Sequence, residues 1–172
     1  MASQPIPNER FRRGKLCSWI KIIRDRKNKL LALSQASYID KVLSRYSMQN
    51  SKKGNLPSRH GIHLSKEQCP KPLQQEEDMR WYPYASAVGS LMYAMLCIRP
   101  DICYVVGVVS RYQSNPGLDH WVAVKCILKY LRRTRNYMLV YSGEDLSLTG
   151  YTDSDFQSNR DSRQSTLLGI VS

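Results

Sequence analysis

The feature that most restricts the fold is a long apolar stretch from Ala85 to Val109, interrupted near its middle by Arg99, Pro100 and Asp101. A helix that spans a bilayer needs about 20 continuous apolar residues, and each half of this stretch is well short of that length. The pattern therefore predicts two buried helices joined by a charged turn. Proline is well tolerated at the first position of a helix, so we expect the second helix to begin at Pro100. We expect no membrane partner for this chain.

The apolar stretch belongs to a block of three predicted helices over residues 84–135. The first of them, residues 84–97, is rich in alanine, serine and glycine, whose small side chains allow close packing against a neighbouring helix. A turn is predicted at Asn115, Pro116 and Gly117. The third helix, residues 118–134, has an apolar stripe at helical spacing, formed by Trp121, Val124, Ile127, Leu128 and Leu131.

Shorter elements are predicted on either side of this block. Two β-rich runs around a polar turn at residues 25–28 predict a hairpin, and apolar residues from Tyr38 to Tyr46 recur at helical spacing. Residues 50–83 contain four prolines and two glycines, which favours a long loop. Alternating residues after position 135 predict strands. The fold class is therefore α+β: an N-terminal hairpin and helix, a long loop, a three-helix block and a final β-sheet.

The net charge indicates the kind of partner. The 172 residues include 26 Lys and Arg against 14 Asp and Glu, a formal charge of +12. Residues 1–83 carry +10 and residues 84–135 carry +5, whereas residues 136–172 carry −3. A balance of this size favours an acidic partner such as a nucleic acid. The basic residues that could follow a phosphate backbone are Lys125, Lys129, Arg132, Arg133 and Arg135. The alternative is an ordinary solvated helix face.

The five cysteines argue against a disulfide framework. Their number is odd, and no two of them are spaced as a Cys-x-x-Cys pair. His60, His63 and Cys69 resemble part of a zinc site, but a fourth ligand at a suitable spacing is missing. The N-terminus has no apolar core of signal-peptide length. We therefore expect an intracellular protein, cytoplasmic or nuclear, with reduced thiols.

Two carboxylates near the C-terminus could carry chemistry. Asp153 and Asp155 follow a predicted strand, and residues two apart in a strand lie on the same face. Carboxylate oxygens are the ligands that Mg²⁺ prefers, and paired carboxylates can hold it for phosphoryl transfer. The alternative is that this short acidic run is a solvated turn.

A series of short motifs then gives the sequence a recognisable order. They are Leu33-Ser-Gln-Ala-Ser-Tyr-Ile-Asp-Lys-Val-Leu43, His60-Gly-Ile-His-Leu64, Tyr84-Ala-Ser-Ala-Val-Gly-Ser-Leu-Met-Tyr93, Arg99-Pro-Asp-Ile102, Ser110-Arg-Tyr-Gln-Ser-Asn-Pro-Gly117, His120-Trp121 and Gly150-Tyr-Thr-Asp-Ser-Asp155. Together they resemble the Pol polyprotein of copia-type LTR retrotransposons. The resemblance runs from about Lys15 to Ser172 and leaves residues 1–14 as an unmatched leader.

The resemblance implies a division of the chain. Residues 15–83 correspond to the end of a reverse transcriptase after its palm, residues 84–135 to a helical thumb or connection segment, and residues 136–172 to the start of an RNase H-like sheet. It also implies that Asp153 descends from the first metal-binding carboxylate of RNase H, which would hold Mg²⁺ in the parent polyprotein. The reverse-transcriptase pair of adjacent aspartates does not occur in this sequence.

The function expected from this resemblance is that of a truncated Pol fragment. The parent would be an RNA-directed DNA polymerase with RNase H activity, whereas the isolated chain is expected to be inactive and to retain binding to RNA, DNA or an RNA–DNA hybrid. The remaining Pol domains are further expected partners. The alternative is a basic nucleic-acid-binding or protein-interaction module recruited by a host.

Overall fold

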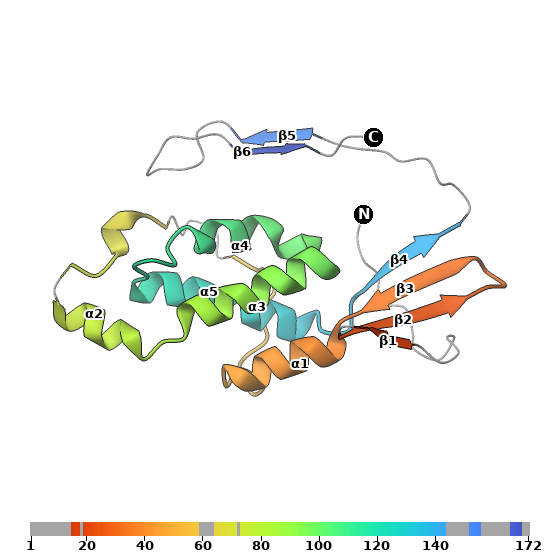
Figure 1. The fold of residues 1–172 in the computed structure, drawn as a ribbon, viewed down its shortest axis with the longest axis horizontal. Helices are drawn as coiled ribbons and strands as arrows, with labels where there is room; N and C mark the ends of the chain where they lie inside the picture. Colours follow the sequence, from red (N-terminus) through yellow and green to blue (C-terminus); the bar gives the residue numbers. More distant parts are fainter. Residues whose placement is uncertain are drawn as a thin grey trace.

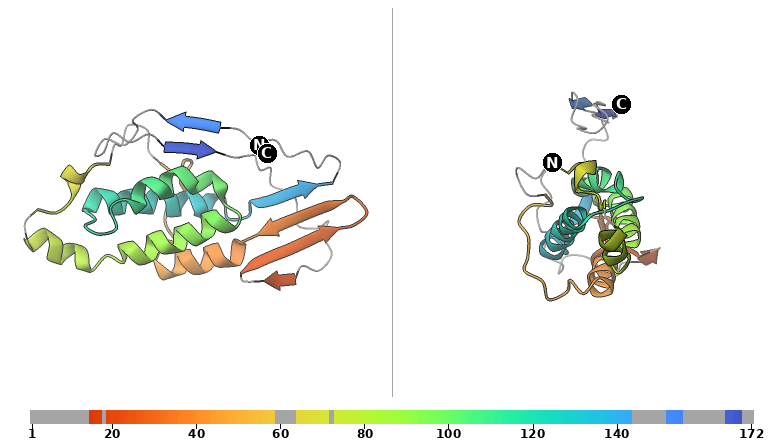
Figure 2. Two further views of the ribbon diagram at one scale, coloured as in Figure 1. Left: turned by 45° about the horizontal axis from the view of Figure 1, so that its top comes forward. Right: turned by 90° about the vertical axis from the view of Figure 1, so that its left-hand side faces the viewer.

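The computed structural model describes residues 15–17, 19–58, 64–71 and 73–143, together with the strands 152–155 and 166–169. Figure 1 shows a helical block with a four-stranded antiparallel sheet, in the order β1-β2-β3-β4, extending from one of its ends. The left-hand view in Figure 2 shows the same arrangement, in which the sheet continues the helical block lengthwise. The fold is α+β, as predicted.

The predicted N-terminal hairpin is confirmed. Strand β2 (Ile20–Asp25) pairs in antiparallel fashion with β3 (Leu30–Ser34), and the short strand β1 (Lys15–Cys17) extends the sheet beyond β2. The turn is stabilised by the Asp25 carboxylate, which accepts hydrogen bonds from the backbone N–H of Lys27 at 3.0 Å and from the side chain of Asn28 at 2.7 Å. The bonds from Asn28 lower the pKa of Asp25.

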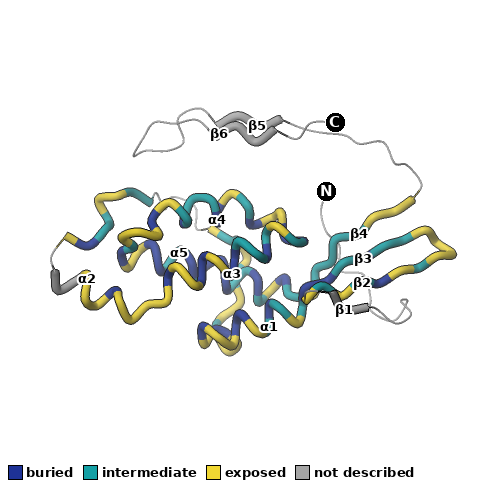
Figure 3. Tube along the Cα trace, viewed as in Figure 1, coloured by how far each residue is buried: buried dark blue, intermediate teal, exposed yellow. Residues whose placement is uncertain are grey.

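The core lies between the longer helices. Helix α1 (Ala36–Arg45) buries the predicted apolar stripe against α3 (Tyr84–Cys97) and α5 (Leu118–Arg133). The predicted three-helix block is confirmed. Its second helix was predicted to begin at Pro100, but a 3-10 turn, η3 (Pro100–Ile102), comes first and α4 runs over Cys103–Ser110. Figure 3 shows that burial is concentrated in these helices. The core includes Leu91, Ile102, Val106, Ile127, Leu128 and Leu131.

The prediction of an unbroken loop over residues 50–83 was wrong in its second half. That region contains a 3-10 turn, η2 (Lys66–Gln68), and a helix, α2 (Leu73–Arg80). The sequence of α2 is Leu-Gln-Gln-Glu-Glu-Asp-Met-Arg, which has no apolar stripe to reveal a helix. Among its described side chains, Met79 is the one that reaches the core.

The strand that follows α5 belongs to a different sheet from the one predicted. We expected residues 136–172 to open a separate RNase H-like sheet, but β4 (Met138–Ser142) pairs with β3, with Leu30 opposite Ser142 and Ser34 opposite Met138. Helix α5 ends beside the open edge of β3, and that position decides the pairing. The strands β5 (Thr152–Asp155) and β6 (Thr166–Gly169) pair with each other in a two-stranded sheet.

None of the helices in the described residues is both long and apolar enough to cross a bilayer.

Candidate nucleic-acid interface

Helix α5 carries four of the five predicted basic residues along one side. Lys125, Lys129 and Arg132 are half-buried and Arg133 is exposed. Positions 125, 129 and 132–133 are separated by three or four residues, so they lie one above the other on the helix surface. No ion pair joins Lys125, Lys129 or Arg132 to another described residue. Their charges are therefore available to an anionic ligand.

The loop after α1 brings further positive charge to the same side of α5. The backbone N–H of Gly54 donates to the carbonyl of Lys129 at 3.0 Å, which holds the loop against the helix. A Cβ atom at position 54 would lie 3.1 Å from the Cβ of Lys129 and 3.2 Å from the backbone nitrogen of Tyr130. Only a glycine lets the two backbones approach this closely without a shift.

This contact creates a groove of about 340 Å³ between the loop and the helix. Lys52 and Lys53 line it from the loop and Lys129 lines it from α5. Arg133 fastens the loop further along, since its guanidinium donates to the Asn55 side-chain oxygen at 2.5 Å. We define Lys52, Lys53 and Lys129 as the basic groove; Lys125 and Arg132 lie near Lys129 on α5. Lys52 and Lys53 were missed by the sequence analysis, which predicted a long loop for their segment.

Arg135 was predicted with the α5 residues but has another contact. It lies beyond the end of α5, and its guanidinium donates two hydrogen bonds to the Asp40 carboxylate of α1. The hydrogen bonds that Arg135 donates to Asp40 raise the pKa of Arg135, and its charge is balanced by that carboxylate. Arg135 therefore joins α1 to the end of α5, and we leave it out of the basic groove.

An ion pair between the buried Arg99 and the partly exposed Asp101 fixes the C-terminal end of α5. Arg99 is only 2% exposed and forms two hydrogen bonds to Asp101, at 2.9 and 2.7 Å. Its guanidinium also donates to the carbonyl of Thr134 at 3.3 Å and to the Thr134 hydroxyl at 2.6 Å. The Tyr130 hydroxyl donates to Asp101 at 2.8 Å. We call Arg99, Asp101, Tyr130 and Thr134 the arginine latch.

The latch also determines the charge state of its carboxylate. Burial opposes the ionisation of Asp101, but the hydrogen bonds and positive charge of Arg99 outweigh that effect and lower its pKa. Burial and the neighbouring Asp101 raise the pKa of Tyr130, which stays a hydrogen-bond donor. The Arg99-Pro-Asp-Ile102 motif therefore positions the half of α5 that bears Lys129 and Arg132.

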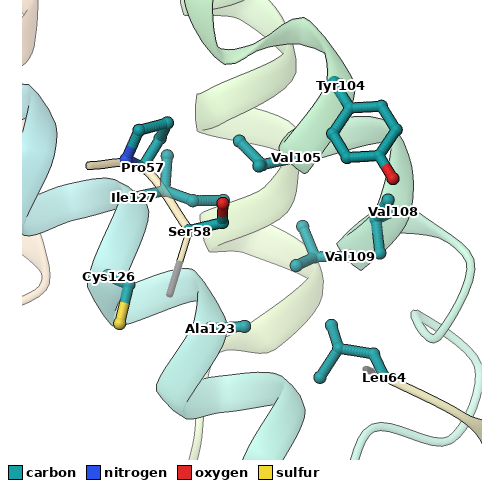
Figure 4. Close-up of a pocket in the computed structure, with 10 residues that line it drawn as sticks. All are labelled: Pro57, Ser58, Leu64, Tyr104, Val105, Val108, Val109, Ala123, Cys126 and Ile127. Atoms are coloured by element: carbon teal, nitrogen blue, oxygen red, sulfur yellow. The ribbon is translucent and has the colours of Figure 1, made fainter. Parts of the chain in front are cut away.

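An apolar pocket of about 120 Å³ lies between α4 and α5 (Figure 4). Pro57 and Ser58 border it on one side, beside Cys126 and Ile127, while Tyr104 and three valines of α4 form the other side. The described residues that line it include no histidine, carboxylate or lysine.

Comparison with known proteins identifies the origin of these elements. The retrovirus-related Pol polyprotein from transposon TNT 1-94 of Nicotiana tabacum is 49% identical over 147 residues, which cover 86% of this chain and 11% of the relative. The retrovirus-related Pol polyprotein from transposon RE2 of Arabidopsis thaliana is 34% identical over 140 residues, covering 79% of this chain and 9% of the relative. The chain is homologous to part of a copia-type retrotransposon Pol polyprotein.

The chain spans about a tenth of the length of these Pol polyproteins. A shorter relative is the secreted RxLR effector protein 161 of Plasmopara viticola, which is 43% identical over 89 residues, covering 51% of this chain and 63% of the relative. No family model matches the chain, and no solved structure matches it significantly.

The Pol relationship makes the position of Asp153 relevant. The residue lies on β5, where its backbone is opposite Leu168 of β6, and Asp155 is opposite Thr166. The side chains of both strands lie outside the described residues, so the predicted Mg²⁺ role of Asp153 stays a prediction. Among the residues whose side chains the structure describes, no three His, Cys, Asp or Glu side chains gather closely enough to hold a metal ion.

Proposed function

We propose that this Pol-derived chain binds nucleic acid through the basic groove and has neither polymerase nor nuclease activity by itself. In this proposal, residues 15–143 derive from the end of the reverse transcriptase and its connection segment, and an RNase H-like part starts after Gly143. Asp153 would be a remnant of its metal site. In the parent polyprotein, Mg²⁺ would supply charge stabilisation for phosphoryl transfer at the polymerase and RNase H centres.

The observation that carries the proposal is the contact between Gly54 and Lys129. It places Lys52 and Lys53 beside Lys129, although some 76 positions separate the loop from the helix in the sequence. Lysines that share a groove and lack a described carboxylate partner attract successive phosphates of a backbone without reading the bases. Binding of this kind releases condensed counterions and weakens steeply as salt increases.

The test is a fluorescence-anisotropy titration of a labelled RNA–DNA hybrid at low and high salt, with Mg²⁺ present. The double variant Lys52→Ala/Lys53→Ala removes two loop charges from the groove. We expect weaker binding, and a plot of log affinity against log salt that is shallower by about one unit for each phosphate that the variant no longer neutralises.

The matched control is Arg26→Ala/Lys27→Ala, which removes two exposed charges from the β2–β3 turn. If both double variants lose affinity equally, binding follows net charge and the basic groove has no special role. If the unmodified chain binds the hybrid at neither salt concentration, the proposed function is wrong.

The absence of catalysis is tested in the same samples. The hybrid should remain uncleaved, and a recessed primer supplied with deoxynucleotides should remain unextended, after prolonged incubation with Mg²⁺. Turnover that persists through further purification would overturn this part of the proposal and would assign an active centre to the chain.

A further inference from the structure

A second groove, at the opposite end of α5 from the arginine latch, has the reverse chemistry of the basic groove. Its volume is about 630 Å³. Trp81 and Tyr82 line it from the link between α2 and α3, Leu118 and Asp119 from the start of α5, and Asp78 from α2. We call it the aromatic–acidic groove.

One wall of this groove is rigid. Gly117 sits so close to the η2 turn that a Cβ atom there would be 1.9 Å from the carbonyl oxygen of Gln68. The Gly117 N–H donates to Nδ1 of His120 at 2.8 Å, and Nε2 of the same buried ring is 3.2 Å from the carbonyl oxygen of Ser65. The ring of Tyr112 stacks on His120 with 4.1 Å between centroids. These contacts hold the 65–70 segment against α5, so the wall exists before any ligand binds.

The groove exposes large apolar side chains. Trp81 is 88% exposed, Leu118 57% and Tyr82 38%, while the Tyr82 ring packs on Trp121 with 5.7 Å between centroids. An indole exposed to this extent leaves nearly all of its surface in water. Aromatic side chains of this kind are enriched at binding surfaces, where one partner covers the ring.

The charge of the groove selects between possible ligands. Asp78 and Asp119 both line it, and neither forms an ion pair with another described residue. Asp119 stabilises the first turn of α5 through the helix dipole, but this role explains neither Asp78 nor the exposed Trp81. Carboxylates repel phosphates, so nucleic acid is disfavoured here even though the chain carries +12 overall.

We propose that the aromatic–acidic groove binds a basic segment of a partner protein. A lysine or arginine of that segment lies over the ring of Trp81, its charge is balanced by Asp78 and Asp119, and a neighbouring apolar side chain covers Leu118. Aromatic faces attract such cations, and nearby carboxylates strengthen the attraction. The inference rests on residues outside the basic groove, so it stands or falls independently of nucleic-acid binding.

The test uses the full chain and a labelled peptide, Arg-Leu-Lys-Arg-Leu-Lys, with the same peptide carrying Glu at every basic position as the ligand control. We expect the basic peptide to bind and the acidic one not to bind. Trp81→Ala should weaken binding about fivefold or more, and Asp78→Asn severalfold. The matched control variants are Leu96→Ala, which trims an exposed apolar residue of α3 outside the groove, and Glu76→Gln, which neutralises an exposed α2 carboxylate that does not line it.

Three results would overturn the inference. The first is equal binding of the basic peptide to the unmodified chain and to Trp81→Ala. The second is loss of RNA–DNA hybrid binding in Trp81→Ala with peptide binding intact, which would assign the ring to base stacking. The third is self-association in sedimentation that Trp81→Ala abolishes, which would make a second copy of this chain the occupant. Because Trp81 is almost fully exposed, its truncation should leave the fold unchanged, and circular dichroism checks this.

Discussion

The two ends of helix α5 are held in different ways and serve grooves of opposite charge. At its N-terminal end, backbone groups of Gly117 and Ser65 contact the buried ring of His120, beside the aromatic–acidic groove. At its C-terminal end, the buried charge of Arg99 is balanced by Asp101 and satisfied by Thr134, beside the basic groove. A helix of 16 residues thus holds two surfaces in fixed separation. A charged pair anchors the C-terminal end of α5, whereas close packing of backbone groups anchors its N-terminal end.

Removing the buried charge of Arg99 should cause the largest loss of stability. Arg99→Met leaves the Asp101 carboxylate without its cation and the Thr134 carbonyl without one of its donors. Because the Asp101 side chain is 34% exposed, the loss in free energy of unfolding should be about 3 kcal/mol, the low end of the range for breaking a buried pair. The measurement is chemical denaturation at neutral pH. An Arg99→Met variant as stable as the unmodified chain would show that the C-terminal end of α5 does not depend on the arginine latch.

At the N-terminal end of α5, an added methyl group at Gly117 should lower the stability of the fold. In Gly117→Ala, the new methyl group would meet the Gln68 carbonyl oxygen at 1.9 Å, and backbone atoms must move to admit it. Insertion of this kind into packed structure costs about 1–3 kcal/mol. Thermal unfolding measures the loss. Gly89→Ala is the control, because a Cβ atom there has no neighbour within 4 Å. Equal stability of the two alanine variants would contradict the rigid wall.

Gly54→Ala tests the contact that forms the basic groove. The added Cβ atom, at 3.1 Å from the Lys129 Cβ, should push the loop outward and cost about 1 kcal/mol, the low end of the range for overpacking. Affinity for the RNA–DNA hybrid should fall because Lys52 and Lys53 move away from Lys129. Binding of the basic peptide at the far end of α5 should be unchanged. Unaltered hybrid binding would separate the groove from the function that we propose for it.

The smallest effect should come from acidification. Because the pKa of Asp101 is lowered in the folded chain, its contribution to stability is complete above the unfolded value of about 3.9 and is lost as the pH falls through the lower folded pKa. Unfolding measured below about pH 4 should show this loss. In Arg99→Met, the part of the acid dependence that comes from Asp101 should disappear. The same acid dependence in both chains would assign it to other carboxylates.

The elements that were predicted correctly carry their signal locally. The apolar stripes of α1 and α5, the proline before α4 and the polar turn of the β2–β3 hairpin each lie within a few residues of the structure they specify. Helix α2 carries no such stripe and was missed. Local patterns also placed residues 125–133 in one continuous helix, as the structure shows.

The rest depends on pairs of residues far apart in the sequence. Arg135 was grouped with Lys129 by proximity along the chain, yet its partner is Asp40, which lies 95 positions earlier. The position of Lys52 and Lys53 beside Lys129 follows only from the contact of Gly54 with Lys129. In the same way, nothing within residues 138–142 predicts that β3 is their partner, because the position of β4 depends on where α5 ends.

The pairing of β4 with β3 also affects the order in which the parts of the chain fold. The hairpin and α1 are synthesised early, but the edge of β3 has no neighbour until residue 142 has left the ribosome. Until then, the hairpin exposes unpaired backbone groups of the kind that recruit foreign strands. Pairing over more than a hundred residues is also entropically slow. We therefore expect α1, α3, α4 and α5 to pack together first. The position of α5 then brings β4 next to β3, and the pairing of these two strands completes the sheet.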